Sequence, residues 1–80
     1  MTFDRIISNP KILGGKPCIK GTRIPVAMVL ELLEEGLTFD EIIQDYYPQI
    51  TRQDIQACLE YAKVIVNGEE IYFIEDSIAF

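Results

Sequence analysis

The stretch PVAMVLELLEEGLTFDEIIQDYYPQITRQDIQACLEYAKVIVNG, residues 25–68, contains the signals of three successive helices. Pro25 suits the first turn of a helix, because an amide hydrogen is not needed at that position. Apolar side chains then recur at helical spacing until Gly36, which is typical of a helix C-terminus. The first helix is therefore predicted over roughly residues 25–35.

Two capping boxes mark where the other two helices begin. In TFDE, residues 38–41, the threonine hydroxyl is placed to accept from the amide of residue 41, and the glutamate reaches back to the threonine amide. TRQD, residues 51–54, repeats this pattern. We expect the second helix to end near Tyr47, since Pro48 disfavours helical geometry in the residue before it. The third helix is predicted to run to about Val66.

The apolar faces of these helices are expected to converge in one core. On the third helix the stripe consists of Ile55, Leu59, Ala62 and Val66. Asn67-Gly68 fits either a helix C-cap or a two-residue hairpin turn, and the unbroken stripe favours the cap. The side chains predicted to be largely buried are Val29, Leu30, Leu33, Ile42, Ile43, Ile55, Leu59 and Ala62.

The N-terminal segment, residues 6–25, reads differently because Pro and Gly interrupt it repeatedly. Short extended pieces are predicted at Ile6-Ile7 and Cys18-Ile19. The glycines are expected to supply turns. Gly14-Gly15-Lys16 lacks the spacing and the following Ser or Thr of a phosphate-binding loop, so a nucleotide site is not expected.

The composition excludes several classes of protein. Eighty residues make one small domain. Histidine is absent and Cys18 and Cys58 are far apart in sequence, so zinc-ligand spacing and a Cys/His nucleophile pair are both missing. Two buried thiols are favoured over a bridge between them. We expect no cofactor, no metal and no enzymatic activity. With no signal-peptide pattern and no apolar run near the roughly 20 residues that span a bilayer, a cytoplasmic protein without a membrane segment is expected.

The net charge of −6 hides an asymmetry along the chain. Residues 1–25 carry five basic side chains and one acidic one, a net charge of +4. Residues 26–80 carry two basic and twelve acidic side chains, a net charge of −10. Segments of opposite sign suggest different partners for the two parts.

Three helices with a tight Pro-containing connection between the last two fit a helix-turn-helix, although a generic three-helix bundle remains open. Asp54 and Glu60 on the third helix would repel phosphates. Arg23 is either a structural hydrogen-bond donor or a phosphate clamp. The candidate DNA-binding residues are Lys16, Lys20, Arg23, Arg52, Gln53, Gln56 and Lys63.

The segment NPKILGGKPCIKGTRIPV, residues 9–26, closely resembles a prokaryotic family, domain of unknown function 433. The family signature is Gly-Gly-x-Pro-x-Ile-x-Gly-Thr-Arg-Ile-Pro-Val. The following Leu-rich helix, residues 36–38, Tyr47-Pro48 and residues 51–61 also look like the family. The resemblance covers roughly residues 5–66.

This resemblance implies a mainly α fold, with a homeodomain-like or winged-helix-like helix-turn-helix core and a small N-terminal β element. It also implies a VapB-type antitoxin paired with a PIN-like ribonuclease toxin. Antitoxins of this kind join a DNA-binding part to a C-terminal segment that occupies the toxin. Residues 1–66 are accordingly assigned to the helix-turn-helix domain and residues 67–80 to an acidic, aromatic tail.

The tail is too polar to bury its own apolar side chains. We expect it to dock on the toxin; folding back as a strand, packing in a homodimer and disorder are the alternatives. The candidate toxin-binding residues are Ile71, Tyr72, Phe73, Glu75, Asp76 and Phe80.

The sequence thus predicts a homodimeric antitoxin that neutralises a PIN-like ribonuclease and binds operator DNA. A stand-alone DNA-binding regulator is one alternative. A protein-interaction adaptor without DNA binding is another, and the acidic residues of the third helix favour it.

Overall fold

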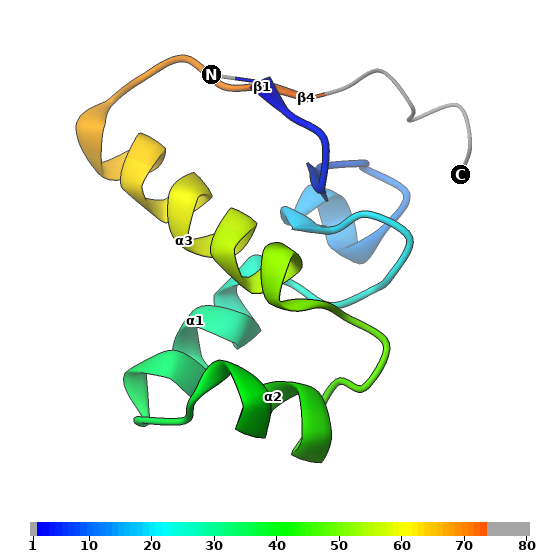
Figure 1. The fold of residues 1–80 in the computed structure, drawn as a ribbon. Helices are drawn as coiled ribbons and strands as arrows, with labels where there is room; N and C mark the ends of the chain where they lie inside the picture. Colours follow the sequence, from blue (N-terminus) through cyan, green and yellow to red (C-terminus); the bar gives the residue numbers. More distant parts are fainter. Residues whose placement is uncertain (1, 74–80) are drawn as a thin grey trace.

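A computed structural model describes residues 2–73 of the chain, which fold into a mainly α structure with a small β element (Figure 1). The three helices contact one another in pairs. The described residues also form two small sheets of two very short strands each. The strands are parallel in one sheet and antiparallel in the other. In chain order the elements are β1 (Thr2–Phe3), β2 (Ile6–Ile7), the 3-10 turn η1 (Leu13–Gly15), β3 (Cys18–Ile19), α1 (Val26–Glu34), α2 (Phe39–Asp45), α3 (Arg52–Asn67) and β4 (Tyr72–Phe73).

Both predicted capping boxes are confirmed. The Thr38 hydroxyl accepts from the amide of Glu41 at 3.1 Å, and the Glu41 carboxylate accepts from the Thr38 amide at 2.8 Å. Thr51 and Asp54 make the same two bonds at the start of α3, at 3.3 and 2.9 Å. The helix starts therefore follow from local side-chain chemistry.

The C-terminal ends of α2 and α3 lie close to their predicted positions. Helix α3 ends at Asn67 and is capped by Gly68, whose φ of 71° is left-handed. The predicted C-cap is therefore confirmed and the hairpin alternative is wrong. Helix α2 ends at Asp45, slightly earlier than the predicted end at Tyr47, and the amides of Tyr46 and Tyr47 both donate to the carbonyl of Ile42.

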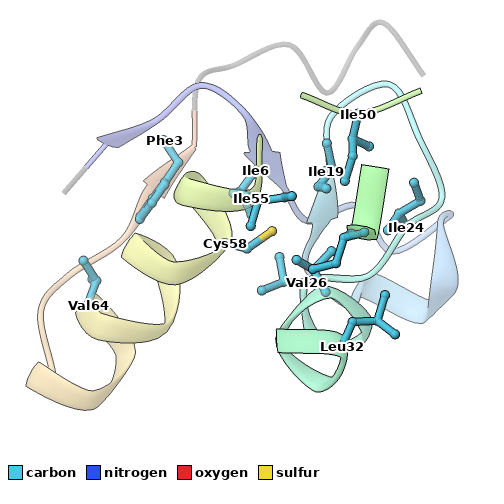
Figure 2. Close-up of a cluster of buried hydrophobic side chains, with 12 residues drawn as sticks. Phe3, Ile6, Ile19, Ile24, Val26, Leu32, Ile50, Ile55, Cys58 and Val64 are labelled. Carbon is cyan, nitrogen blue, oxygen red and sulfur yellow. The ribbon is translucent and has the colours of Figure 1, made fainter. Parts of the chain in front are cut away.

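The two predicted extended pieces pair with each other. Ile6 lies opposite Ile19 and Ile7 opposite Cys18 in the antiparallel β2·β3 pair, and all four side chains are buried. These four side chains belong to the buried clusters of the protein, although helical periodicity in the sequence does not predict them (Figure 2). The main cluster of buried side chains is Phe3, Ile6, Ile19, Ile24, Val26, Val29, Leu32, Ile42, Ile50, Ile55, Cys58 and Val64.

Both cysteines are buried free thiols, as predicted. Burial raises the pKa of Cys58 to about 12, and the nearby carboxylate of Asp54 adds to the rise. Burial also raises the pKa of Cys18, although the charge of Arg23 offsets part of this effect. Thiols held in the neutral form react poorly, so these two side chains act as small core residues.

The predicted apolar stripe of α3 is wrong in its register. Leu59 is 43% exposed and Val66 is 84% exposed, whereas the buried residues are Ile55, Cys58 and Val64. These three positions differ by multiples of three. In a helix with 3.6 residues per turn, each advance of three residues falls about 60° short of a full turn, so the buried direction shifts by that angle. The core-facing side therefore rotates along α3.

The rotation follows a change of packing partner along α3. Helix α3 contacts α1, α2 and β2. Farther along, the Tyr61 ring packs edge-on against Phe3 at 5.3 Å between centroids and stacks on Phe73 at 6.2 Å. Figure 2 shows Phe3 beside α3 and Cys58 facing the side chains contributed by the other elements of the same cluster.

Of the other residues predicted to be buried, Val29, Ile42 and Ile55 are fully enclosed. The remaining four are partly buried, and three of them pack against the core. These four are Leu30, Leu33, Ile43 and Ala62.

The beginning of the predicted tail is part of this packed structure. β4 pairs in parallel with β1, with Thr2 opposite Tyr72 and Phe3 opposite Phe73. Residues 72–73 thus adopt the strand alternative, and Ile71 and Phe73 pack against the core. No helix in residues 2–73 is both long and apolar enough to cross a bilayer.

Candidate nucleic-acid interface

A tight turn between β3 and α1 carries two of the candidate basic residues, Lys20 and Arg23. The Thr22 hydroxyl donates to the Ile19 carbonyl at 2.7 Å and accepts from the Ile24 amide at 3.0 Å. Gly21 takes a φ of 81°, which other residue types adopt only at a cost. This turn, residues 20–23, is therefore held in one shape by its own side-chain and backbone bonds.

Arg23 is an exposed residue in this turn. Within residues 2–73 its guanidinium makes no hydrogen bond or ion pair. The structure of these residues therefore does not support the predicted role of Arg23 as a structural hydrogen-bond donor. The guanidinium remains accessible to an external anion.

The turn is fastened to the N-terminus of α3 through Arg5. The amide of Lys20 donates to the carbonyl of Arg5 at 2.8 Å. The Arg5 guanidinium in turn bonds the carboxylate of Asp54 at 3.1 Å. Asp54 belongs to the capping box of α3. A shallow depression at this junction is lined by Asp4, Arg5, Lys20, Gly21 and Asp54. The turn and the first residues of α3 are therefore neighbours.

The candidates on α3 share its outer face. Arg52, Gln56 and Lys63 are spaced at i, i+4 and i+11, which places them on one side of the helix together with the exposed Leu59. Gln53 flanks them. A second shallow depression runs along this face, lined by Gln53, Gln56, Ala57, Leu59, Glu60 and Lys63.

The charged side chains of this face are paired within the chain. Arg52 bonds the carboxylate of Asp40 on α2 at 2.8 Å, and Lys63 bonds Glu60 at 3.1 Å. Exposed pairs such as these contribute only about 0 to 1 kcal/mol each. With these pairs formed, the outer face of α3 is close to neutral.

Lys16 lies in a different loop from the other DNA-binding candidates. It follows η1, in a segment where Ser8 donates its hydroxyl to the Gly15 carbonyl. This loop packs through Ile12 on Ile7 and Cys18, in a small cluster separate from the main core. The structure therefore places the turn that carries Lys20 and Arg23 beside the N-terminus of α3, whereas Lys16 lies on a loop of its own.

The candidate toxin-binding residues divide into three groups. Ile71 and Phe73 are partly buried against the core. Tyr72 is exposed, and its hydroxyl bonds the carboxylate of Glu70, which raises the pKa of Tyr72. The last three candidates, Glu75, Asp76 and Phe80, lie outside the described residues.

Sequence reasoning missed two features of these surfaces. Arg5 was not a candidate, because its partner Asp54 is 49 positions away and no local signal connects them. Leu59 and Val66 were assigned to the core, although both lie on the exposed face of α3. Among residues 2–73, no three side chains of Cys, Asp or Glu gather where they could hold a metal ion.

Comparison with known proteins gives two matches. The protein-family model described as "Protein of unknown function (DUF433)" matches residues 6–62. The crystal structure of a DUF433 member protein from Anabaena variabilis is similar, with a TM-score of 0.72 and 28% sequence identity over 81% of this chain. The alignment covers 63% of that protein, so this chain spans less than two thirds of its length. No curated protein matches.

Proposed function

The chain belongs to the DUF433 family, and we propose that it is the antitoxin of a type II toxin–antitoxin system. In this proposal it binds operator DNA and neutralises a PIN-like ribonuclease. The DNA surface consists of the turn at residues 20–23 and the first two turns of α3. The observation that carries the proposal is the link through Arg5 and Asp54, which keeps these two elements side by side.

The arrangement of the helices supports this surface. Residues 46–51 form a short connection between α2 and α3, and both helices pack on α1. In a helix-turn-helix, the N-terminal residues of the second helix of the motif read base edges in the major groove. Here α3 takes that role, and Gln53 and Gln56 offer the amide groups that pair with adenine.

The turn supplies the contacts that fix register on the duplex. Lys20 and Arg23 are suited to phosphate oxygens, which carry no sequence information but provide most of the electrostatic attraction. The left-handed Gly21 keeps this turn compact, and Lys20 lines a depression that it shares with Asp54 of α3. In this proposal the turn supplies the phosphate contacts and the start of α3 supplies the base contacts.

The test of DNA binding is a fluorescence-anisotropy titration. The probe is a labelled duplex of about 30 base pairs, or three helical turns, from the DNA upstream of the chain's own coding sequence. Arg23→Gln is expected to weaken binding and to lower the slope of log K against log salt by up to about one unit. The matched control is Lys11→Gln, which removes one exposed positive charge outside the proposed surface. Equal effects of the two substitutions would place the contact elsewhere.

Toxin neutralisation is assigned to the C-terminal tail. Tyr72 is 56% exposed on β4, so it is available as an aromatic anchor. The acidic residues Glu75 and Asp76 complement a nuclease cleft that attracts RNA. A chain truncated after Phe73 retains β4 and its stack on Tyr61, and we expect it to fold like the full chain but to leave the adjacent-gene ribonuclease active.

The truncation separates this role from folding. Circular dichroism and urea unfolding should give the same helix content and midpoint for the full and truncated chains, while an RNA-cleavage assay distinguishes them. If the truncated chain still silenced the ribonuclease at equal concentration, the tail beyond Phe73 would not be the inhibitory element.

A second candidate function, a protein-interaction adaptor without DNA binding, is favoured by a specific observation. Arg5, Arg52 and Lys63 each pair with a carboxylate of the same chain, and the whole chain carries a net charge of −6. A protein that silences the ribonuclease but binds no upstream DNA would be this adaptor.

A further inference from the structure

Arg52 has two partners at the start of α2. Its guanidinium bonds the carboxylate of Asp40 at 2.8 Å, and its central carbon lies 5.0 Å from the centre of the Phe39 ring. The Arg52 side chain is nevertheless 60% exposed, and that of Asp40 is 73% exposed. The guanidinium is thus held over an aromatic ring while much of it still faces solvent.

We propose that Phe39 and Asp40 hold Arg52 ready for a DNA phosphate, and that the phosphate replaces Asp40 when DNA binds. This inference rests on the DNA-binding function proposed above and names the residues that regulate it. Phe39 is the support, Asp40 is the displaced ligand, and Arg52 is the contact to DNA.

The chemistry of the three groups fits an exchange of anions. A guanidinium presents five N–H donors in a planar fork that suits a phosphate as well as a carboxylate. An exposed carboxylate is held weakly, because solvent screens the pair. The cation–π contact with Phe39 needs no anion, so it persists during the exchange and limits the side-chain freedom that DNA binding must remove.

Asp40 also acts as a competitor for the DNA. Its carboxylate occupies the guanidinium in the free protein, so every DNA complex that uses Arg52 must first break this pair. Removing the carboxylate should therefore tighten binding beyond the general benefit of losing one negative charge. Asp40 is in this sense a residue that sets affinity without touching the DNA.

The experiment compares Asp40→Asn with Asp45→Asn, using the same labelled upstream duplex and fluorescence anisotropy. Both residues lie on α2 and are exposed, and both substitutions remove one negative charge. Within residues 2–73, however, Asp45 has no ion pair, so Asp45→Asn measures the general charge effect. Neither substitution replaces Thr38 or Glu41, the two residues of the capping box.

We expect Asp40→Asn to tighten DNA binding about two- to fivefold more than Asp45→Asn, in line with the strength of an exposed ion pair. In an Arg52→Ala background this excess should disappear, because the pair no longer exists. Arg52→Lys should bind DNA less well than wild type, since a lysine keeps the charge but not the planar fork.

Two failures are distinguishable. If wild type binds the duplex and the two aspartate substitutions have equal effects, or if the excess survives in the Arg52→Ala background, the exchange of anions is wrong and the DNA-binding function stands. If wild type binds no DNA, the proposed DNA-binding function and this inference both fall.

Discussion

Two valines near the end of α3 give a direct test of its rotating buried face. Val64 is fully buried and Val66 is 84% exposed, although only one residue separates them. Val64→Ala removes about two buried methylene equivalents, worth about 1.6 kcal/mol of transfer free energy at 0.8 kcal/mol each. Incomplete collapse of the resulting cavity adds to this cost. We expect a total loss of about 2 kcal/mol in the free energy of unfolding.

Val66→Ala is the matched control because it removes the same atoms from the same helix. It takes away little buried area, and alanine favours a helix by up to about 0.7 kcal/mol over valine, so the expected change is near zero or slightly stabilising. Urea unfolding followed by circular dichroism measures both. For a domain of this size 1 kcal/mol corresponds to about 4–8 °C in Tm, so the two variants should separate clearly. Equal losses, or a larger loss for Val66→Ala, would refute the packing described for α3.

Two further predictions follow from burial and backbone geometry. The free energy of unfolding should fall as pH rises above about 9, because an unfolded thiol ionises there while burial holds the Cys58 thiol protonated up to a pKa of about 12. The Cys58→Ala variant should show a smaller fall. A free energy of unfolding that stays level from pH 8 to pH 11 would contradict this prediction. Gly68→Ala should lower the free energy of unfolding by about 1 to 2 kcal/mol, because the φ of 71° at this position is left-handed. Steric overlap does not contribute, since a Cβ there would meet no neighbouring atom within 4 Å. The urea midpoint measures the change, and an unchanged midpoint would argue against the left-handed cap.

The starts of α2 and α3 were predictable because their signals are local. Thr38 and Glu41 are three residues apart, and so are Thr51 and Asp54, so each capping box forms from a single turn of chain. The C-cap at Gly68 is equally local.

The register of α3 was not predictable because its packing partners are distant in sequence. Tyr61 packs on Phe3 and Phe73, which come from opposite ends of the described chain and meet through the β1·β4 pair. Periodicity assumes one buried face along the whole helix, and that assumption fails where the partner changes.

The candidate interface shows the same division. Residue types in the basic turn and on the outer face of α3 were visible in the sequence. The contact between the turn and the start of α3 was not visible. It depends on Arg5, whose carbonyl bonds the turn and whose guanidinium bonds Asp54. Long-range ion pairs of this kind leave no periodic or capping signal.

The most direct test of DNA binding by this surface is an NMR titration of the ¹⁵N-labelled chain with the upstream duplex. Binding as proposed shifts the backbone amides of residues 20–23 and of residues 51–56 first and most. Amides of α1, which carries no residue of the proposed surface, should move little. Shifts confined to α1 or to residues 65–73, or no shifts at all, would contradict the assignment of the basic turn and the N-terminal half of α3 to DNA.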